Sequence, residues 1–478
     1  MNASAMTAPT HDLTAHPWFF CGIGGSGMLP LTLILRGHGG EIAGSDRSRD
    51  QGRSAEKFAW LEAQGIRLFP QDGSGIVSAN QTLVASAAVE KNVPEVVRAA
   101  ELGCATMTRA ELLATLFNAS GCGIAVGGTS GKSTVTGMLG WIMAQVGRDP
   151  TIMNGAVMKN FVSDDAPFAS ARVGRGDIFV SEVDESDGSI TLYRPAIAVL
   201  NNVSLDHKSL EELRDLFGGF LRASAKAAVN FDDEETFALS FNAPMFISYG
   251  IDSIDATIGV IPGSIEDGWT SQSATIINRA DGSEYPLKLQ LPGRHNLANA
   301  LAAIAGAAAA DISVGESVTA LASFAGLARR FDIIGTSPSN ITVIDDFGHN
   351  PEKVTATLAT LRAHPGRIIA FFQPHGFGPL RQMGADLANV LAARLGPNDL
   401  TILCDPVYFG GTVDRSVSSE HVVAWIESAG GHAEHIPDRA ACADRIVFLA
   451  RPGDRIVVMG ARDDTLTAFA TEILARVG

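Results

Sequence analysis

Cysteine is scarce in this chain of 478 residues, and no two of its five cysteines form a C-x-x-C pair. Paired cysteines are typical of zinc ribbons and thiol–disulfide enzymes, and dense cysteines are typical of small secreted scaffolds. The sequence excludes both patterns and predicts buried thiols in a reducing compartment. The five are Cys21, Cys104, Cys122, Cys404 and Cys442.

Basic residues are also fewer than acidic residues. The chain has 36 lysines and arginines against 52 acidic residues, which gives a formal net charge of −16. Such a surface has no general attraction for a phosphate backbone, so we expect no nucleic-acid partner. A polyanionic small substrate must instead be held by donors that are placed locally.

Long apolar runs are missing as well. No run approaches the roughly 20 residues that a membrane-spanning helix needs. Residues 1–16 have neither a basic start nor an apolar segment, so we expect a disordered tail over 1–17 and no secretory signal. The sequence therefore predicts a cytoplasmic protein without a membrane partner, and it leaves open whether the protein is a monomer or a homodimer.

The chain does contain enough apolar sequence for several cores. Hydrophobic residues make up 46% of it and charged residues 18%, and its length suits three domains. Short β-rich runs alternate with helical stretches, which is typical of α/β proteins with largely parallel sheets. We expect domains over 18–112, 113–326 and 327–478.

The expected elements follow from this alternation. The predicted strands are 18–23, 41–44, 82–86, 123–126, 177–183, 196–202, 341–345, 367–372, 400–404 and 455–459. The predicted helices are 27–35, 108–117, 133–146, 209–229 and 295–310. Between 246 and 291, short strands with turn residues predict an antiparallel insert.

The strongest local signal is a glycine-rich segment between the expected strand 123–126 and the expected helix 133–146. Glycines let backbone N–H groups turn inward and hold phosphate oxygens at the start of a helix. Lys132 is expected to supply positive charge to the γ-phosphate as it is transferred, and the Ser133 hydroxyl is expected to bind Mg²⁺. Val126 stands where the strict P-loop spacing has its first glycine, so this is a shortened variant. The alternative is a glycine-rich turn that ends in Lys-Ser by chance, and the flanking strand and helix argue against it.

A second group of polar residues follows two successive expected strands. Glu182–Asp187 lies at the end of the first, and Asn202, Asp206 and His207 follow the second. The carboxyl ends of parallel strands meet at one edge of the sheet, where ligands collect on open α/β sheets. An acidic cluster by itself is more often a solvated loop. A carboxylate and an imidazole beside a phosphate loop nevertheless suit a divalent metal that bridges nucleotide and substrate.

These segments resemble, in order, the successive signatures of the Mur ligase family, which also includes folylpolyglutamate synthetase. The likeness runs colinearly from residue 18 to residue 462. It implies an α/β protein of three domains: a Rossmann-like N-terminal domain, a central P-loop ATPase-like domain with an antiparallel insert, and a C-terminal Rossmann-like domain. Besides the two segments above, the matching motifs are Gly22–Met28, Gly44–Asp46, Pro292–Asn299, Arg329–Phe331, Asp345–Pro351 and Gln373–His375.

The resemblance implies which residues bind ATP and Mg²⁺. Lys132 and Ser133 are expected to meet the triphosphate and the metal, with Glu182 and His207 as further metal partners. Asn296 is expected to hold adenine. The full set expected at the nucleotide is Gly128, Thr129, Ser130, Gly131, Lys132, Ser133, Thr134, His295, Asn296, Asn299, Arg330 for the phosphates and Asp346 for the ribose. Simpler interpretations remain for His295, as part of a helix start, and for Asp346, as the N-cap of the helix after Pro351.

The resemblance also implies the substrates and the chemistry. A nucleotide sugar like UDP-N-acetylmuramate is expected at Gly22, Gly24, Gly25, Ser26, Gly27, Met28, Asp46 and Ser86. Its carboxylate would attack the γ-phosphorus of ATP to give an acyl phosphate, which an amine then attacks. His349 and His375 are candidates to take the proton of the amine or to orient it. Domain closure would exclude the water that hydrolyses the intermediate.

The expected acceptor segment departs from the family pattern. In the enzymes that join UDP-N-acetylmuramate to L-alanine, which the motifs resemble most, Gln-Pro-His is followed by two arginines suited to a carboxylate. Here the segment reads Gly376–Arg381, and neither arginine position is kept. Asn350 replaces a second histidine. Phe347 replaces a tyrosine, which is a point of resemblance to the muropeptide ligases of wall recycling, but the rest of their acceptor motif is absent.

The function expected from the sequence is therefore an ATP-dependent, ADP-forming ligase that joins UDP-N-acetylmuramate to L-alanine or a related amino acid. Two alternatives within this class are a recycling ligase that adds a preformed peptide, and a ligase with a different substrate in a specialised pathway. A nicotinamide-dependent oxidoreductase would use Gly22–Gly27 but would leave Lys132, Glu182 and His207 without a role. A non-catalytic nucleotide sensor would bind ATP without turnover.

Overall fold

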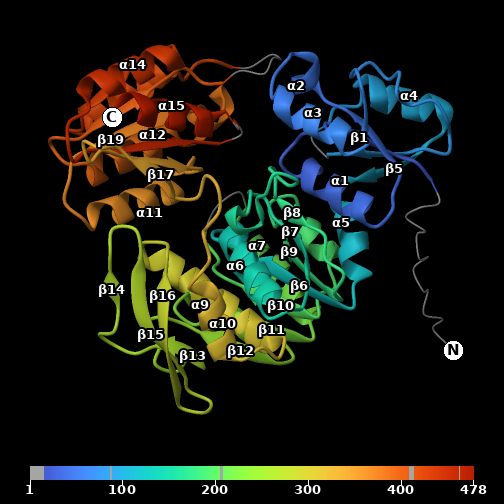
Figure 1. The fold of residues 1–478 in the computed structure, drawn as a ribbon, viewed down its shortest axis with the longest axis horizontal. Coiled ribbons are helices and arrows are strands. Elements are labelled where there is room, and N and C mark those ends of the chain that lie inside the picture. The colour runs from blue at the N-terminus through green and yellow to red at the C-terminus, as the bar shows by residue number, and fades with distance from the viewer. Residues whose placement is uncertain (1–15, 87–88, 205–207, 408–413, 462, 464) are drawn as a thin grey trace. The chain divides into compact units, whose positions relative to one another are not determined.

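The computed structural model describes residues 16–86, 89–204, 208–407, 414–461, 463 and 465–478. Most of the tail that we expected over 1–17 lies outside the described residues. The chain forms two compact units. One comprises Met1–Ile265, Ser273–Lys288 and Ala298–Ala325, and the other comprises Glu266–Gln272, Leu289–Leu297 and Gly326–Gly478. Strands and helices alternate along most of the chain (Figure 1).

The first sheet is parallel, with the strand order β3-β2-β1-β4-β5. This is the order of a Rossmann-like sheet, in which ligands bind beyond the carboxyl ends of the strands at the point where the order reverses. That point is the end of β1, where the first glycine cluster begins. The strands are β1 (Trp18–Cys21), β2 (Ile42–Ser45), β3 (Arg67–Phe69), β4 (Thr82–Ala85) and β5 (Ala105–Thr108). The helices are α1 (Met28–Gly37), α2 (Arg47–Asp50), α3 (Ala55–Ala63), α4 (Pro94–Leu102) and α5 (Arg109–Asn118).

The central sheet runs in the order β15-β13-β12-β11-β10-β6-β9-β7-β8, with β16 paired to β15. Its strands are β6 (Cys122–Gly127), β7 (Thr151–Met153), β8 (Ala171–Arg172), β9 (Ile178–Glu182), β10 (Ile197–Leu200), β11 (Lys226–Asn230), β12 (Phe246–Tyr249), β13 (Ile258–Val260), β15 (Gln272–Asn278) and β16 (Ser283–Leu289), and the short β14 is Glu266–Asp267. Its helices are α6 (Lys132–Gln145), η1 (Lys159–Phe161), η2 (Ser189–Leu192), α7 (Leu210–Arg222), α8 (Glu234–Leu239), η3 (Ser240–Asn242), α9 (Arg294–Ala309) and α10 (Val314–Leu321). The strands β6, β9 and β10 are parallel and central, so the segments after them meet at one edge.

Two expectations for this region were wrong. The helix predicted over 209–229 ends at Arg222, and its last part forms β11, because the buried run Ala227–Val229 pairs with the strands on both sides. The antiparallel insert does not begin at 246. β12 continues the parallel sheet, since the chain returns to it through the crossover helix α8, and antiparallel pairing begins only between β13 and β15.

The C-terminal sheet has the order β17-β18-β22-β19-β20-β21. It is parallel except for β17, which is antiparallel to β18 and, like β21, was not among the expected strands. The strands are β17 (Asp332–Thr336), β18 (Thr342–Asp346), β19 (Ile368–Gln373), β20 (Leu400–Leu403), β21 (Ala433–His435) and β22 (Arg455–Gly460). The helices are α11 (Pro351–Arg362), α12 (Phe377–Arg394), α13 (Ser419–Ser428), α14 (Arg439–Leu449) and α15 (Leu466–Arg476). In the part of the chain that the structure describes, no helix is long and apolar enough to cross a membrane.

Candidate functional site

The glycine-rich loop leads from β6 directly into α6, as the sequence predicts. Two of its glycines have positive φ angles, +135° at Gly128 and +82° at Gly131. A β-carbon at Gly131 would lie 2.5 Å from the side chains of Asn201 and Asn299. Glycine is therefore required at Gly131 both by the backbone conformation and by the close approach of these amides.

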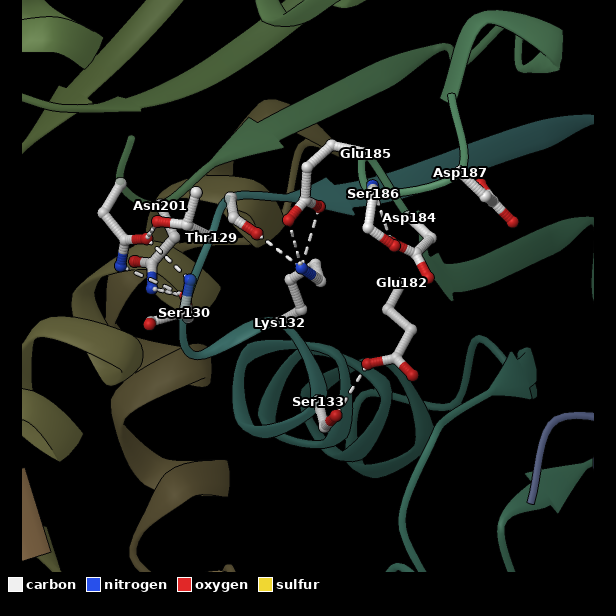
Figure 2. A network of polar contacts seen from close by, with 12 residues as sticks. Thr129, Ser130, Lys132, Ser133, Glu182, Asp184, Glu185, Ser186, Asp187 and Asn201 are labelled. Atoms are coloured by element: carbon white, nitrogen blue, oxygen red, sulfur yellow. Dashed lines mark hydrogen bonds and ion pairs between the residues drawn. The ribbon is translucent and has the colours of Figure 1, made fainter. Parts of the chain in front are cut away.

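Asparagine side chains hold the loop from the segment that directly follows the neighbouring strand β10. The Asn202 side-chain oxygen accepts hydrogen bonds from the Ser130 backbone N–H (2.8 Å) and from the Thr129 hydroxyl (2.9 Å). The Asn201 amide donates to the Ser130 carbonyl (3.0 Å) and to the Asn299 side-chain oxygen (3.1 Å), as Figure 2 shows in part. The buried Tyr249 hydroxyl donates to Asn201 (3.1 Å), and burial raises the pKa of Tyr249 well above its ordinary value. These contacts hold the loop's conformation, and two of them use the backbone N–H groups of Thr129 and Ser130, which both donate to Asn202.

Lys132 is paired with a buried carboxylate of the acidic segment. Its ammonium donates to both oxygens of Glu185, at 2.8 and 3.1 Å, and to the Gly128 carbonyl at 2.7 Å (Figure 2). The Glu185 side chain is 5% exposed and that of Lys132 is 19% exposed. Burial raises the pKa of Glu185, although the nearby Lys132 acts in the opposite direction.

Ser133 and Glu182, two of the residues expected at a metal, lie in contact. The Ser133 hydroxyl donates to Glu182 Oε2 at 2.7 Å (Figure 2). The Asn154 amide donates to the Ser133 carbonyl at 2.9 Å. Hydroxyl and carboxylate oxygens are ligands that Mg²⁺ prefers, and Mg²⁺ at a phosphate site takes its remaining ligands from phosphates and water. Two protein oxygens beside a phosphate loop therefore fit this ion. His207, the third expected ligand, lies outside the described residues, as does Asp206. Within those residues, no three His, Cys, Asp or Glu side chains come together as a metal site.

The other carboxylates of the acidic segment are engaged elsewhere. Asp184 accepts hydrogen bonds from the N–H and hydroxyl groups of Ser186. Asp187 accepts the Ser189 N–H at 2.9 Å and lies 3.7 Å from the Arg109 guanidinium. Figure 2 shows Asp187 apart from Lys132. Of this acidic segment, Glu182 and Glu185 are therefore the carboxylates that contact the loop.

The first glycine cluster forms the turn between β1 and α1. Asp46 holds it: Oδ2 accepts the Gly24 N–H at 2.8 Å, and Oδ1 accepts the Ser48 N–H at 2.8 Å. The Arg109 side chain lies against Gly27, 3.0 Å from the point where a β-carbon would stand. Among the described residues, no side-chain oxygen caps the N-terminus of α1. The expected residues of this turn, Gly22, Gly24, Gly25, Ser26, Gly27 and Met28, are thus contiguous at the start of a helix, and Ser86 directly follows β4.

In the C-terminal unit, Asp346 joins three segments. Its Oδ2 atom accepts the Phe331 N–H (2.7 Å), and Oδ1 accepts the Gly348 N–H (2.8 Å) and the Thr357 hydroxyl (2.9 Å). The interpretation of Asp346 as the N-cap of the next helix is wrong. Asn350 caps α11 by accepting the Lys353 N–H at 2.9 Å, because it immediately precedes Pro351 at the first helical position.

The two histidines expected near the amine lie side by side. The ring centroids of His349 and His375 are 5.2 Å apart, with the planes nearly perpendicular. His349 Nδ1 lies 2.9 Å from the Phe347 carbonyl oxygen. Burial, followed by the charge of Lys353, lowers the pKa of His349 to about 3. His349 is therefore uncharged at neutral pH.

The acceptor segment begins α12. Arg381 forms an ion pair with Asp414 at 3.1 Å, and the Arg415 guanidinium lies 5.2 Å from the centre of the Phe377 ring. Arg330, expected at the phosphates, lies 4.3 Å from the centre of the Phe347 ring. Asn296, expected at adenine, is buried in the first turn of α9 and donates to the Pro292 carbonyl at 2.8 Å. His295 also lies in this turn, so the simpler interpretation of it as part of a helix start is consistent with the fold.

Comparison with known proteins decides the family. Three family models match in succession: the Mur ligase family catalytic domain over residues 19–120, the Mur ligase middle domain over 126–307, and the Mur ligase glutamate ligase domain over 329–462. The UDP-N-acetylmuramate–L-alanine ligase of Streptomyces coelicolor is 32% identical over 459 residues, which cover 93% of this chain and 95% of that protein. The ligase of the same name from Mesorhizobium japonicum is 34% identical over 469 residues, covering 94% and 96%. The chain belongs to the Mur ligase family.

Solved structures confirm the three-domain α/β fold of this Mur ligase. The UDP-N-acetylmuramate–alanine ligase of Thermotoga maritima superposes with a TM-score of 0.79 at 24% identity, covering 96% of this chain and 99% of that one. A murein peptide ligase from Psychrobacter arcticus superposes with a TM-score of 0.71 at 23% identity, covering 97% and 99%. At these identities the likeness is one of fold.

In each unit of this Mur ligase, the structure shows contacts of residues for which the sequence predicted no role. Asn201 and Asn154 brace the loop, and Arg109 lies against the first glycine cluster. In the C-terminal unit, Asp463 receives hydrogen bonds from Gln373 (2.8 Å) and Arg439 (2.9 Å). Of these residues, only Asn201 could have been predicted from the sequence, because it follows β10 at the same sheet edge as Asn202.

Proposed function

We propose that this Mur ligase activates the carboxylate of UDP-N-acetylmuramate with ATP and joins it to the amine of L-alanine or a related amino acid. The observation that carries the proposal is the phosphate loop with Lys132 and Ser133 at the start of α6, beside Glu182. Relatives of 32–34% identity along nearly the whole chain carry the corresponding enzyme name. The five free cysteines are in keeping with a reducing, cytoplasmic setting.

The first step needs positive charge at the phosphoryl group. A carboxylate is a poor electrophile, so its oxygen first attacks the γ-phosphorus, and Lys132 and the loop N–H groups stabilise the charge that the transferring group carries. Ser133 and Glu182, with His207, would hold Mg²⁺, which when bound neutralises part of the same charge. Gly128, Thr129, Ser130, Gly131 and Thr134 complete the cradle.

The remaining nucleotide contacts are proposed from the matching motifs. Asn296, with His295 and Asn299, would bind the adenine side, and Arg330 would approach the phosphates. Asp346 would bind the ribose. A carboxylate has about four lone-pair sites, and three of those of Asp346 already accept hydrogen bonds, so it retains room for one hydroxyl donor.

The nucleotide sugar is proposed to bind at the N-terminal domain, 18–112. The turn Gly22–Met28 leads into a helix N-terminus that no described side chain caps, which suits a diphosphate. Asp46 keeps the turn in shape, and Ser86 lies at the end of the adjacent strand β4. The central domain, 113–326, would bind ATP, and the C-terminal domain, 327–478, would bind the amine.

The amine must attack uncharged, so a group in the C-terminal unit takes its proton. His349, with a pKa near 3, is a weak base. We therefore assign the proton to His375, with the neighbouring His349 ring orienting it.

A second acceptor class is favoured by one observation. Arg381 is paired with Asp414, and the segment Gly376–Pro379 offers no guanidinium for an amino-acid carboxylate. A preformed peptide, whose amine end is remote from its carboxylates, is the alternative acceptor on UDP-N-acetylmuramate.

The test is release of ADP and phosphate with UDP-N-acetylmuramate, Mg²⁺ and a panel of amino acids and peptides. Release with L-alanine supports the leading proposal. Release with a tripeptide but not with alanine assigns the protein to peptide addition. No release with any amine, from a protein that binds ATP, would leave a nucleotide sensor.

A further inference from the structure

The contact between Lys132 and Glu185 occupies the ammonium that the proposed function assigns to the triphosphate. An ammonium has three N–H donors. Here they face the Gly128 carbonyl and both oxygens of one carboxylate, all within 3.1 Å. The phosphoryl-transfer step itself gives no reason for this contact.

Glu185 is the carboxylate of its segment that is committed to Lys132. Glu182 binds Ser133, Asp184 binds Ser186, and Asp187 binds Ser189. The Glu185 side chain is also nearly buried, with 5% exposed, so solvent contributes little to its stabilisation. Figure 2 shows it reaching toward Lys132 from the opposite side to the Ser133–Glu182 contact.

Bound phosphate would change the energetics of the Lys132–Glu185 pair. A buried carboxylate is stable when a cation partners it, and removal of that cation leaves an uncompensated charge. Phosphate oxygens that approach Lys132 compete with Glu185 for the same N–H groups. Nucleotide binding and the Lys132–Glu185 contact therefore oppose each other.

We propose that Glu185 is a positioning residue of the phosphate loop. Its carboxylate holds Lys132 over the loop in the nucleotide-free enzyme, yields the ammonium to the phosphates, and takes it back as ADP leaves. The inference rests on the proposed function, because it assumes that a nucleotide occupies the loop. Two consequences follow: Lys132 is ordered before ATP arrives, and ADP is held less tightly than the loop alone would hold it.

The test uses the full-length protein and a fluorescent ADP, with binding followed by titration and release by stopped flow. Glu185→Gln keeps a side-chain oxygen for Lys132 but removes the charge. It should bind ADP about tenfold tighter and release it about tenfold more slowly, as expected for loss of one charge-assisted contact. Steady-state kcat and the KM for ATP should fall together, a pattern that mere loosening of the fold would not give. Glu211→Gln, an exposed carboxylate in the first turn of α7, is the matched control and should leave ADP binding unchanged.

A second pair of variants separates action through Lys132 from direct repulsion of the nucleotide. In a Lys132→Ala background, Glu185→Gln should alter ADP affinity by less than about twofold. An equal gain in both backgrounds would overturn the proposal, and so would unchanged or weaker ADP binding by a folded Glu185→Gln protein. If that variant does not fold, Glu185→Asp takes its place: it retracts the carboxylate by one methylene and should also tighten ADP. If the wild-type protein binds ADP and Glu185→Gln binds it identically, this inference alone is wrong. If the wild-type protein binds no ADP, the proposed function is wrong as well.

Discussion

Gly155 leaves the space that the Glu182 carboxylate occupies. A β-carbon at residue 155 would overlap with Glu182 Oε1 and would lie 3.5 Å from the Ser133 hydroxyl. The obstructing atom is the far end of a flexible side chain, so an added methyl group would displace the carboxylate before it disturbed the backbone. The position of Glu182 at the proposed metal thus depends on a glycine that is distant in sequence.

Gly155→Ala is expected to weaken metal binding while the fold persists. Gly155 is not among the residues with positive φ, so alanine fits its backbone. Displacement of Glu182 should raise the Mg²⁺ concentration at half-maximal activity by about tenfold, because one carboxylate ligand is lost. Mg²⁺ titration of ADP release measures this, with Gly219→Ala as a control at a glycine inside α7, where an added β-carbon would meet nothing closer than 3.8 Å. An unchanged Mg²⁺ requirement would contradict the role of Glu182.

Gly131→Ala is expected to damage the phosphate loop itself. The positive φ of +82° and the 2.5 Å approach to Asn201 and Asn299 oppose any side chain there. The strain should cost about 1–2 kcal/mol of stability, as for alanine at a left-handed position. Thermal unfolding and ADP titration should both show the loss. Wild-type values for both would mean that the loop relaxes freely.

Lys132→Ala is expected to abolish turnover and to leave UDP-N-acetylmuramate binding largely intact. Lys132 serves the transferring phosphoryl group, whereas the proposed sugar-nucleotide site is the separate turn after β1. Calorimetric titration with the nucleotide sugar tests this, beside an activity assay. Loss of sugar-nucleotide binding would show that the two sites are not separate.

His349 is expected to make the C-terminal unit sensitive to acid. Its pKa is lowered to about 3, below the ordinary value of 6.5, so the unfolded chain binds the proton more readily. The stabilisation is full above pH 6.5 and is lost as the pH falls toward 3. His349→Gln should therefore reduce the drop in melting temperature between pH 7 and pH 5.

The matched control for this prediction is His38→Gln. His38 is an exposed histidine at the end of α1, and its replacement should leave the drop in melting temperature as it is in the wild-type protein. An identical pH dependence in His349→Gln and wild type would show that His349 is not buried as described.

The sequence by itself determined the features that depend on local order along the chain. Strand periodicity, followed by glycines and then a helical pattern, is enough to locate the phosphate loop before α6 and the first glycine cluster before α1. It also located Glu182 at a strand end, because the carboxyl ends of parallel strands meet at one edge. Family motifs ordered these segments into three domains, and comparison confirmed the family.

The tertiary structure decided which side chains meet. Irregular segments have no fixed period, so the sequence of 182–187 could not show that Glu185 pairs with Lys132 while Asp187 pairs with Arg109. The sequence likewise predicted one helix over 209–229, although its last part forms β11. A short apolar run can be a helix or a strand, and here pairing with the strands on both sides decides for the strand. The same holds for the contact of Glu182 with Gly155 and for the hydrogen bond from Asn201 to the phosphate loop. In both cases residues far apart in sequence come within contact distance only after the sheet has formed.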